Sequence, residues 1–430
     1  IAHHLPDLRS LSCLDTASLH VKAVFNTYGT EILESIMGSS LPLQTCQIIR
    51  IVVLLRSESS RITFDTFFDQ HFRERPISAA CNPIPSETPP SVLRDVLSTA
   101  TDITNLADHC LGEFMHRCLI LRPSHLLDKS KMTKMDQMRH FSINCRQYPG
   151  QPYTPHSSGP PSWLETRRAM NAFWSLQLYL DLVTSIFSGR IVWADERLGW
   201  DAVELKRMCD YSRGVESLAD GDVQVYSFPG HRIKMVSEDS ALDTVVEFLK
   251  DVYGWELPSC RREDVPLGGC LTFKEKHQQS LHLPSHSSEA QSFDWENEGV
   301  GPFPGCDDEF GRNLFPDSSN KSWNAFFRGP AEEFIDDICF LSKIFPGLRL
   351  EFKSFQRLGM AFWDSRRLMA LELLGPYEED GFFDYGRYKY FDRFDLCYTW
   401  KSILPQEEAK EVPGCMAGSE IEDGEFSEGW

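Results

Sequence analysis

Two histidines and two cysteines, which are side-chain types that bind zinc, crowd a single predicted helix: His109, Cys110, His116 and Cys118. Ligands that share a helix face must lie three or four residues apart, and no two of these four residues have that spacing. The cysteines fall on the apolar stripe of the predicted helix, and the histidines flank it. We therefore expect packing roles for this group and no metal site.

A second group of possible metal ligands lies further along the chain. It contains His277, His282 and His286, and then Cys306 with the acidic run Asp307–Asp308–Glu309. Histidines five and four residues apart could bind a divalent cation. The surrounding sequence is polar and has no periodicity, and polar linkers contain such residues by composition alone. We prefer the interpretation that these residues occur together by chance. A site that binds a divalent metal ion is the alternative.

The chain has no recognisable catalytic motif. It lacks a G-x-S-x-G sequence and any cysteine-protease signature. The glycine pairs Gly268–Gly269 and Gly299–Gly301 lack the strand-to-helix context and the following lysine of a phosphate-binding loop. Adjacent carboxylates such as Asp336–Asp337 point apart on a helix. We predict no catalytic residue and no cofactor. An enzyme or small-molecule binder whose site is assembled from distant residues is the alternative.

The segment 381–400 is dense in aromatic residues that alternate with charges. Tyrosine, tryptophan and arginine contribute much of the binding energy at protein interfaces. A strand or loop laid over the core would have the same composition, and this second interpretation stays open. The residues predicted as a protein-interaction surface are Tyr385, Arg387, Tyr388, Tyr390, Arg393, Tyr398 and Trp400.

Composition and charge exclude some partners. The chain has 430 residues, a hydrophobic content of 41% and a net charge of −20. Residues 1–150 hold equal numbers of basic and acidic residues, so the negative excess lies in 151–430. Such a surface repels phosphate backbones, which argues against nucleic-acid binding. The longest apolar stretch, 48–55, is interrupted by Arg50 and is too short to span a bilayer.

Cysteine usage predicts the compartment. The 13 cysteines are an odd number without C-x-x-C pairs, and several fall within apolar helical patterns. This usage is typical of a reducing environment, and residues 1–9 show no secretory signal pattern. We expect an intracellular protein, cytoplasmic or nuclear.

Apolar spacing predicts a mainly α, multi-helix globular domain around a central helical hairpin, with a minor β element. In the first hairpin helix, apolar residues recur every three or four positions from Ala169 to Phe187, and Gly189 suits a left-handed C-terminal cap. A narrow polar seam implies that other elements cover most of this helix. The second hairpin helix is expected at 201–208, where Asp201 and Glu204 have capping-box spacing.

Other helices are predicted on both sides of the hairpin. A helix from Leu8 should stop at Gly29, another should begin at Pro42, and the most regular one should run from Ser91 to Leu121. Further helices are expected at 242–252, 330–344 and 364–375, the last ending at Gly375–Pro376. Residues 223–235 alternate as a β-hairpin, and 348–352 as a short strand.

These patterns predict a division of the chain into consecutive regions. The boundaries are 1–72 for an N-terminal helical segment, 73–257 for a central helical region, 258–321 for a flexible insertion, 322–405 for the C-terminal part of the core and 406–430 for an acidic disordered tail.

Three stretches resemble a group of uncharacterised filamentous-fungal proteins, some with an F-box-like N-terminal region. They are PPSWLETRRAMNAFWSLQLYLDL at 160–182, FQRLGMAFWDSRRLMALELLG at 355–375 and LPDLRSLSCLDTASLHVKAVFNTYGTEIL at 5–33. The third resembles the middle of an F-box-like segment. An F-box grips its ubiquitin-ligase adaptor with a leading Leu-Pro helix, which in this chain would have to lie upstream of Ile1.

The resemblance implies a protein-interaction module, in particular a divergent F-box-like substrate receptor, with a ubiquitin-ligase adaptor as its partner. The patterns themselves favour a protein partner over a nucleic acid or a membrane. A scaffold without biochemical activity is a third hypothesis.

Overall fold

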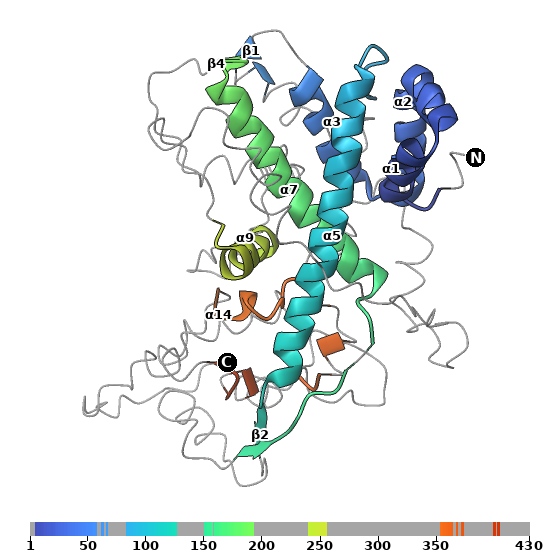
Figure 1. The fold of residues 1–430 in the computed structure, drawn as a ribbon. Helices are drawn as coiled ribbons and strands as arrows, with labels where there is room; N and C mark the ends of the chain where they lie inside the picture. Colours follow the sequence, from blue (N-terminus) through green and yellow to red (C-terminus); the bar gives the residue numbers. More distant parts are fainter. Residues whose placement is uncertain are drawn as a thin grey trace, which may run out of the picture. The chain divides into compact units, whose positions relative to one another are not determined.

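The computed structural model of the chain describes residues 5–57, 62–63, 66–67, 83–126, 150–157, 159–192, 240–255, 353–363, 367–368, 371–373, 399–400 and 402–404. These residues divide into two compact units. The first unit contains the described parts of 5–111, 163–192 and 241–255, and the second contains those of 112–162, residue 240 and the described residues beyond 352. Figure 1 labels the helices and strands.

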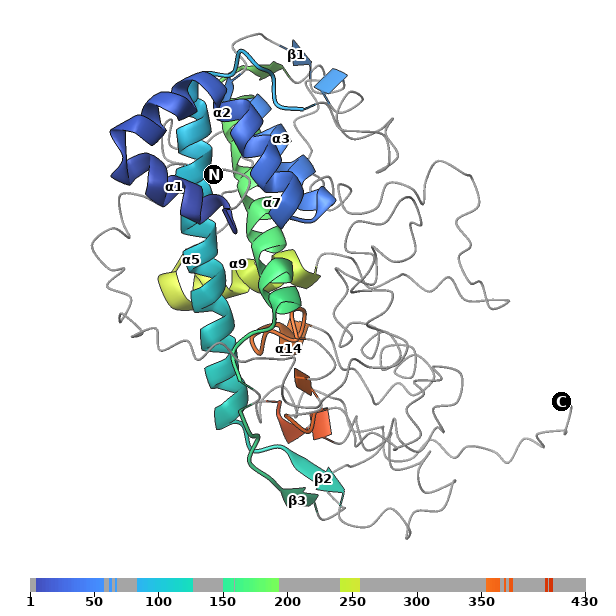
Figure 2. The ribbon, with the colours of Figure 1, turned by 90° about the vertical axis from the view of Figure 1, so that its right-hand side faces the viewer.

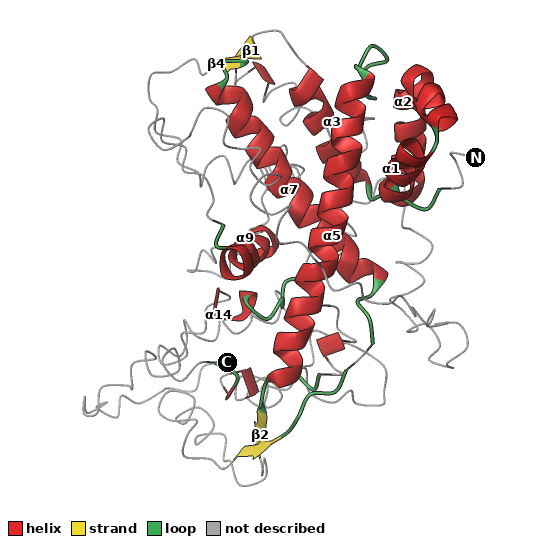
Figure 3. Ribbon diagram, in the orientation of Figure 1, coloured by secondary structure: helices red, strands yellow, loops and turns green. Residues whose placement is uncertain are grey.

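The fold is mainly α with a minor β element, as the sequence predicts (Figure 3). The longer helices are α1 (Leu8–Ala17), α2 (Leu19–Ser40), α3 (Leu43–Ser57), α5 (Pro90–Ile120), α7 (Trp163–Phe187) and α9 (Ser240–Tyr253), and α14 (Lys353–Gln356) is a single turn. None of the described helices is long and apolar enough to cross a membrane.

The described strands are short and form two separate pairs. β1 (Ile62–Thr63) pairs in parallel with β4 (Ile191–Val192), in the register Ile62 with Ile191. β2 (Ser124–Leu126) pairs antiparallel with β3 (Gly150–Pro152). Neither pair is the β-hairpin expected at 223–235, because that segment lies outside the described residues, as does the strand expected at 348–352.

In the first unit, α1 and α2 lie side by side, and α3 packs along α7 (Figures 1 and 2). The polar seam of α7 is buried in this packing: Asn171 is 1% exposed and its Oδ1 accepts a hydrogen bond of 2.9 Å from the Thr45 hydroxyl of α3. Next along the same helices, Arg56 of α3 binds Asp181 of α7 at 2.9 Å. The prediction that other elements cover most of α7 is therefore confirmed.

Helix ends follow the local sequence at several sites. Pro90 occupies the first position of α5, where its missing N–H costs nothing. Gly189 after α7 and Gly254 after α9 take the left-handed conformation, with φ of 70° and 62°. This conformation is open to glycine and ends a helix by redirecting the chain. The predicted left-handed cap at Gly189 is confirmed.

The helix end predicted at Gly29 is wrong. The helix that begins at Leu8 breaks at Ser18, and α2 then continues through Gly29 to Ser40, with only a kink at Tyr28 (φ −123°, ψ 19°). A side chain at position 29 would meet the methyl group of Leu93 in α5 at 2.8 Å. Glycine is therefore used here for close approach between helices and not as a stop signal.

In the second unit, the helix expected at 364–375 ends early. Leu371 N donates to Arg367 O at 2.8 Å, Glu372 takes a φ of 55°, and Leu373 N donates to Leu368 O at 2.8 Å. This pattern is a Schellman ending with glutamate in the left-handed position, several residues before Gly375–Pro376. The sequence missed it because glutamate does not favour this conformation.

Side chains from elsewhere in the second unit bind the carbonyl groups around that ending. The Tyr153 hydroxyl donates to the Glu372 carbonyl at 2.8 Å, and the Trp400 indole N–H donates to the Leu373 carbonyl at 2.7 Å. These bonds leave the carbonyls satisfied, and they help to hold Glu372 in an unfavourable conformation. Burial and the nearby Glu372 charge raise the pKa of Tyr153, so its hydroxyl keeps the proton that it donates.

Several predicted segments lie outside the described residues. They are the second hairpin helix at 201–208, the helix at 330–344, the insertion at 258–321 and the tail at 406–430. Their structures stay predictions.

Candidate interaction surface

Residues 8–28 form an N-terminal arm that consists of α1 and the first half of α2. Asp7 caps α1, because its Oδ1 accepts a 2.7 Å hydrogen bond from Ser10 N. Ser18 is extended (φ −133°, ψ 115°) and caps α2 through a 3.3 Å bond from Val21 N. Both side chains satisfy backbone donors that a helix start leaves free. One extended residue thus separates two capped helices, which fold back on each other.

The first half of α2 exposes large apolar side chains. Leu19 is 86% exposed, Val24 37% and Tyr28 53%, whereas Phe25 in the same segment is fully buried. Half of the large hydrophobic side chains that are exposed among the described residues therefore lie within ten residues of one helix. Exposed clusters of this kind mark sites of interaction more often than isolated apolar residues do.

The same helix turns carry a positive charge at Lys22. His20 and Lys22 are exposed, and no acidic residue occurs from position 18 to position 30. We define the α2 surface as Leu19, His20, Lys22, Val24 and Tyr28. It combines apolar contact area with positive charge.

Arg94 of α5 holds the arm in place. Its Nε donates to Asp15 Oδ2 of α1 at 2.9 Å, and its Nη2 donates to Asn26 Oδ1 and to the Lys22 carbonyl of α2. The guanidinium group also lies over the Phe25 ring, 5.7 Å from its centre. One side chain thus fixes both helices of the arm through charge-assisted bonds and a cation–π contact.

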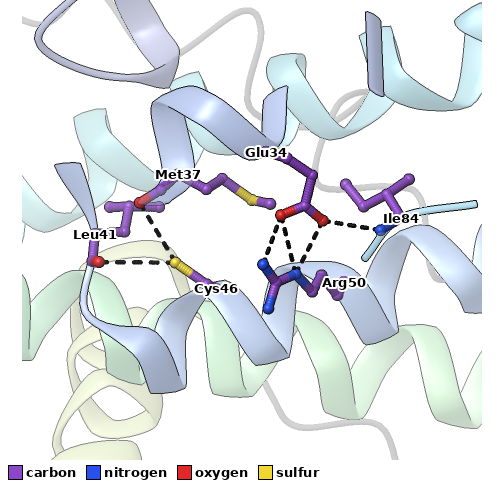
Figure 4. Close-up of polar contacts among 6 residues, drawn as sticks. All are labelled: Glu34, Met37, Leu41, Cys46, Arg50 and Ile84. Atoms are coloured by element: carbon purple, nitrogen blue, oxygen red, sulfur yellow. Dashed lines mark hydrogen bonds and ion pairs between the residues drawn. The ribbon is translucent and has the colours of Figure 1, made fainter. Parts of the chain in front are cut away.

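The second half of α2 is anchored differently. Arg50 of α3 makes a bidentate ion pair with Glu34, and Glu34 Oε1 also accepts a 2.8 Å bond from Ile84 N (Figure 4). The Cys46 thiol donates to the Met37 carbonyl at 3.4 Å (Figure 4). Leu33, Ile36 and Met37 are fully buried around these contacts. This half of α2 therefore belongs to the core that it shares with α3.

The predicted C-terminal surface is described at one residue. Trp400 is fully buried, 5.0 Å from the Phe355 ring, with its indole N–H bonded to Leu373. In this structure Trp400 is therefore a core residue and not part of an exposed surface. Its ring packs against Phe355 and its N–H is hydrogen-bonded, both within the second unit. The other six residues lie outside the described residues and stay predictions: Tyr385, Arg387, Tyr388, Tyr390, Arg393 and Tyr398.

The histidine and cysteine group of α5 makes packing contacts. His109 Nδ1 lies 2.6 Å from the Tyr253 hydroxyl of α9, and Cys110 is fully buried. In the second unit the Cys118 thiol donates to the Leu358 carbonyl at 3.4 Å, and burial raises its pKa to about 12. No three His, Cys, Asp or Glu side chains among the described residues are placed to hold a metal ion. The second possible metal group, from His277 onward, lies outside them.

Sequence reasoning missed the α2 surface because it predicted one helix from Leu8 to Gly29 and did not separate buried from exposed apolar positions. The buried stripe is Phe25, Gly29, Leu33 and Ile36, with steps of four, four and three. Leu19 and Val24 fall off that stripe, so a helical projection extended past Gly29 could have identified them. The partners of Arg94 lie 68 to 79 residues away in the sequence, where no local pattern reveals them.

Comparisons with known proteins add no relative. No protein-family model matches the chain, and searches of the curated proteins and of the solved structures find no match.

Proposed function

We propose that the chain is an intracellular protein-interaction module that binds a protein partner through the α2 surface. The observation that carries this proposal is the exposure of Leu19, Val24 and Tyr28 on one short helix segment. A solvated face normally carries charged and polar residues. Large apolar side chains on such a face are unfavourably exposed to water, and burial under a partner lowers the free energy.

The resemblance of 5–33 to an F-box-like region suggests the partner. That stretch contains the whole arm, so the α2 surface lies in the helical segment that, in an F-box-like region, would follow the leading Leu-Pro helix and could extend the contact with a ubiquitin-ligase adaptor. The exposed Lys22, in a stretch without carboxylates, favours a partner whose contact face carries carboxylates. We therefore propose an F-box-like substrate receptor that binds a ligase adaptor through its N-terminal helices.

A pair of valine substitutions tests the surface. Val24 and Val192 are exposed to nearly the same extent, 37% and 39%, and both belong to the first unit. Titration of purified ligase adaptor into the full chain should show binding to the wild type and a loss of at least tenfold in affinity for Val24→Asp, since a buried charge without a partner is costly at an interface.

The matched variant Val192→Asp should bind within about twofold of the wild type, because it places the same charge on an exposed strand outside the surface. Circular dichroism spectra of both variants should match that of the wild type. Failure of the adaptor to bind the wild-type chain would reject the F-box version of the proposal. Equal losses for the two variants would reject the α2 surface as the binding site.

A further inference from the structure

We infer that the N-terminal arm is a hinged element, with its hinge at Tyr28 and its latch at Arg94, and that it opens as one piece while the second half of α2 stays on α3. The opening would regulate the α2 surface, and this regulatory role rests on the proposed function. The hinge and the latch do not, because they are properties of the chain alone.

The hinge is visible in the backbone. Tyr28 has φ −123° and ψ 19°, outside the helical region, although the residues on both sides are helical. Kinks of this kind interrupt the hydrogen-bond ladder of a helix and concentrate bending at one position. The next residue is Gly29, which has no side chain to resist rotation. The Tyr28 ring is half exposed, so it does not lock the bend by packing.

The two sides of the hinge are held very differently. Beyond it, α2 has three fully buried apolar side chains and the bidentate Glu34–Arg50 pair. Before it, Phe25 is the only apolar side chain of α2 that is buried, and α1 adds Leu8 and Leu11. Local opening follows the regions with the least buried apolar area. The arm is therefore the element that should open first.

The latch depends on one residue. All four contacts of Arg94 go to the arm: Asp15, Asn26, the Lys22 carbonyl and the Phe25 ring. The only described ion pair that also joins the arm to α5, Arg9 with Asp108, has a 3.9 Å separation and is about half exposed. Such exposed pairs contribute little to stability.

The closed arm also contains an unsatisfied polar atom. Asp15 is 8% exposed, and its Oδ1 is buried without a hydrogen-bond partner, while Oδ2 binds Arg94. A buried carboxylate oxygen without a partner opposes the closed state, because water would hydrate it once the arm opened. Opening would also uncover the face of the Phe25 ring over which Arg94 lies, which extends the apolar area of the α2 surface.

Hydrogen exchange measured by mass spectrometry on the full chain tests the hinge and the latch. In Arg94→Met the amides of 8–28 should exchange at least tenfold faster than in the wild type, while those of 30–40 and 43–57 should be unchanged. The milder variant Asn26→Ala removes one exposed contact and should accelerate the same amides by a smaller factor. Unchanged exchange in 8–28 would overturn the latch. Equal acceleration of 8–28 and 30–40 would overturn the hinge.

Titration of the same variants with purified ligase adaptor tests the regulation. Arg94→Met should bind at least threefold more tightly than the wild type, because less free energy is spent on opening the arm. Weaker or equal binding would overturn the regulatory role. If the wild type does not bind the adaptor at all, the proposed function fails, and the exchange data alone still decide the hinge.

Discussion

Alanine in place of Gly359 should destabilise the second unit more than any other glycine substitution considered in this chain. Gly359 has a φ of 68°, and a Cβ built there would lie 2.6–2.8 Å from three atoms of the Phe114 side chain. Phe114 is fully buried and stacks on Phe362, with 6.1 Å between ring centres. The ring therefore has no open space into which it could move.

Two costs add at this position. A left-handed backbone costs an alanine about 1–2 kcal/mol relative to glycine, and overpacking a filled core costs about 1–3 kcal/mol. The expected loss is therefore roughly 2–5 kcal/mol for Gly359→Ala. Gly159 separates the two costs, because it has a φ of 85° and nothing within 4 Å of its virtual Cβ. Gly159→Ala should lose only about 1–2 kcal/mol.

Gly112 supplies the matched control without strain. It lies inside α5 with nothing within 4 Å of its virtual Cβ, so Gly112→Ala should raise stability by up to about 1 kcal/mol through helix propensity. All three positions belong to the second unit. The assay is urea-dependent hydrogen exchange of peptides from that unit, because two units need not unfold together. A loss for Gly359→Ala no larger than that for Gly159→Ala would refute the reasoning about the Phe114 ring.

Two further predictions concern buried ionisable groups. Arg56→Met should cost up to about 3–5 kcal/mol, because it removes the ion-pair partner of the Asp181 carboxylate, whose pKa burial already raises, and leaves it a hydrogen bond with Gln177 and the more distant charge of Arg190. Since a raised folded-state pKa favours the protonated form, this deficit should shrink as the pH falls from 7 toward 4, and the double variant Arg56→Met/Asp181→Asn should recover part of it; urea unfolding at both pH values checks this. Iodoacetamide at pH 8, followed by peptide mapping, should modify the exposed Cys13 and spare Cys118, whose pKa burial raises from 9.0 to about 12. The same raised pKa means that Cys118 supports folding below pH 9 and that this support is lost as the pH rises through 12; rapid labelling of Cys118 at pH 8 would contradict its placement in the core.

Local sequence rules predict the helices of this chain well where a helix is defined by its own residues. The spacing of apolar residues and a terminal glycine correctly place α7, its cap at Gly189, and α9. The long helix α5 and the seam of α7 follow from the same rules, although α5 begins at Pro90 and not after Ser91. These features depend on neighbours within a few residues, and such neighbours are all that a sequence pattern contains.

The same rules fail where distant contacts decide the conformation. Gly29 continues a helix because Leu93, 64 positions away, packs against it. Glu372 adopts a left-handed conformation beside hydrogen bonds from Tyr153 and Trp400. The α2 surface was not predicted for a related reason: the local sequence does not show whether an apolar residue will be covered by another element.

The most direct test of the α2 surface is a hydrogen-exchange footprint of the full chain with and without purified ligase adaptor. Bound adaptor should slow exchange in peptides that cover Leu19 to Tyr28, and peptides of α7 and β4 should exchange as in the free chain. Protection that spares 19–28 while it appears elsewhere in a saturated complex would contradict the account.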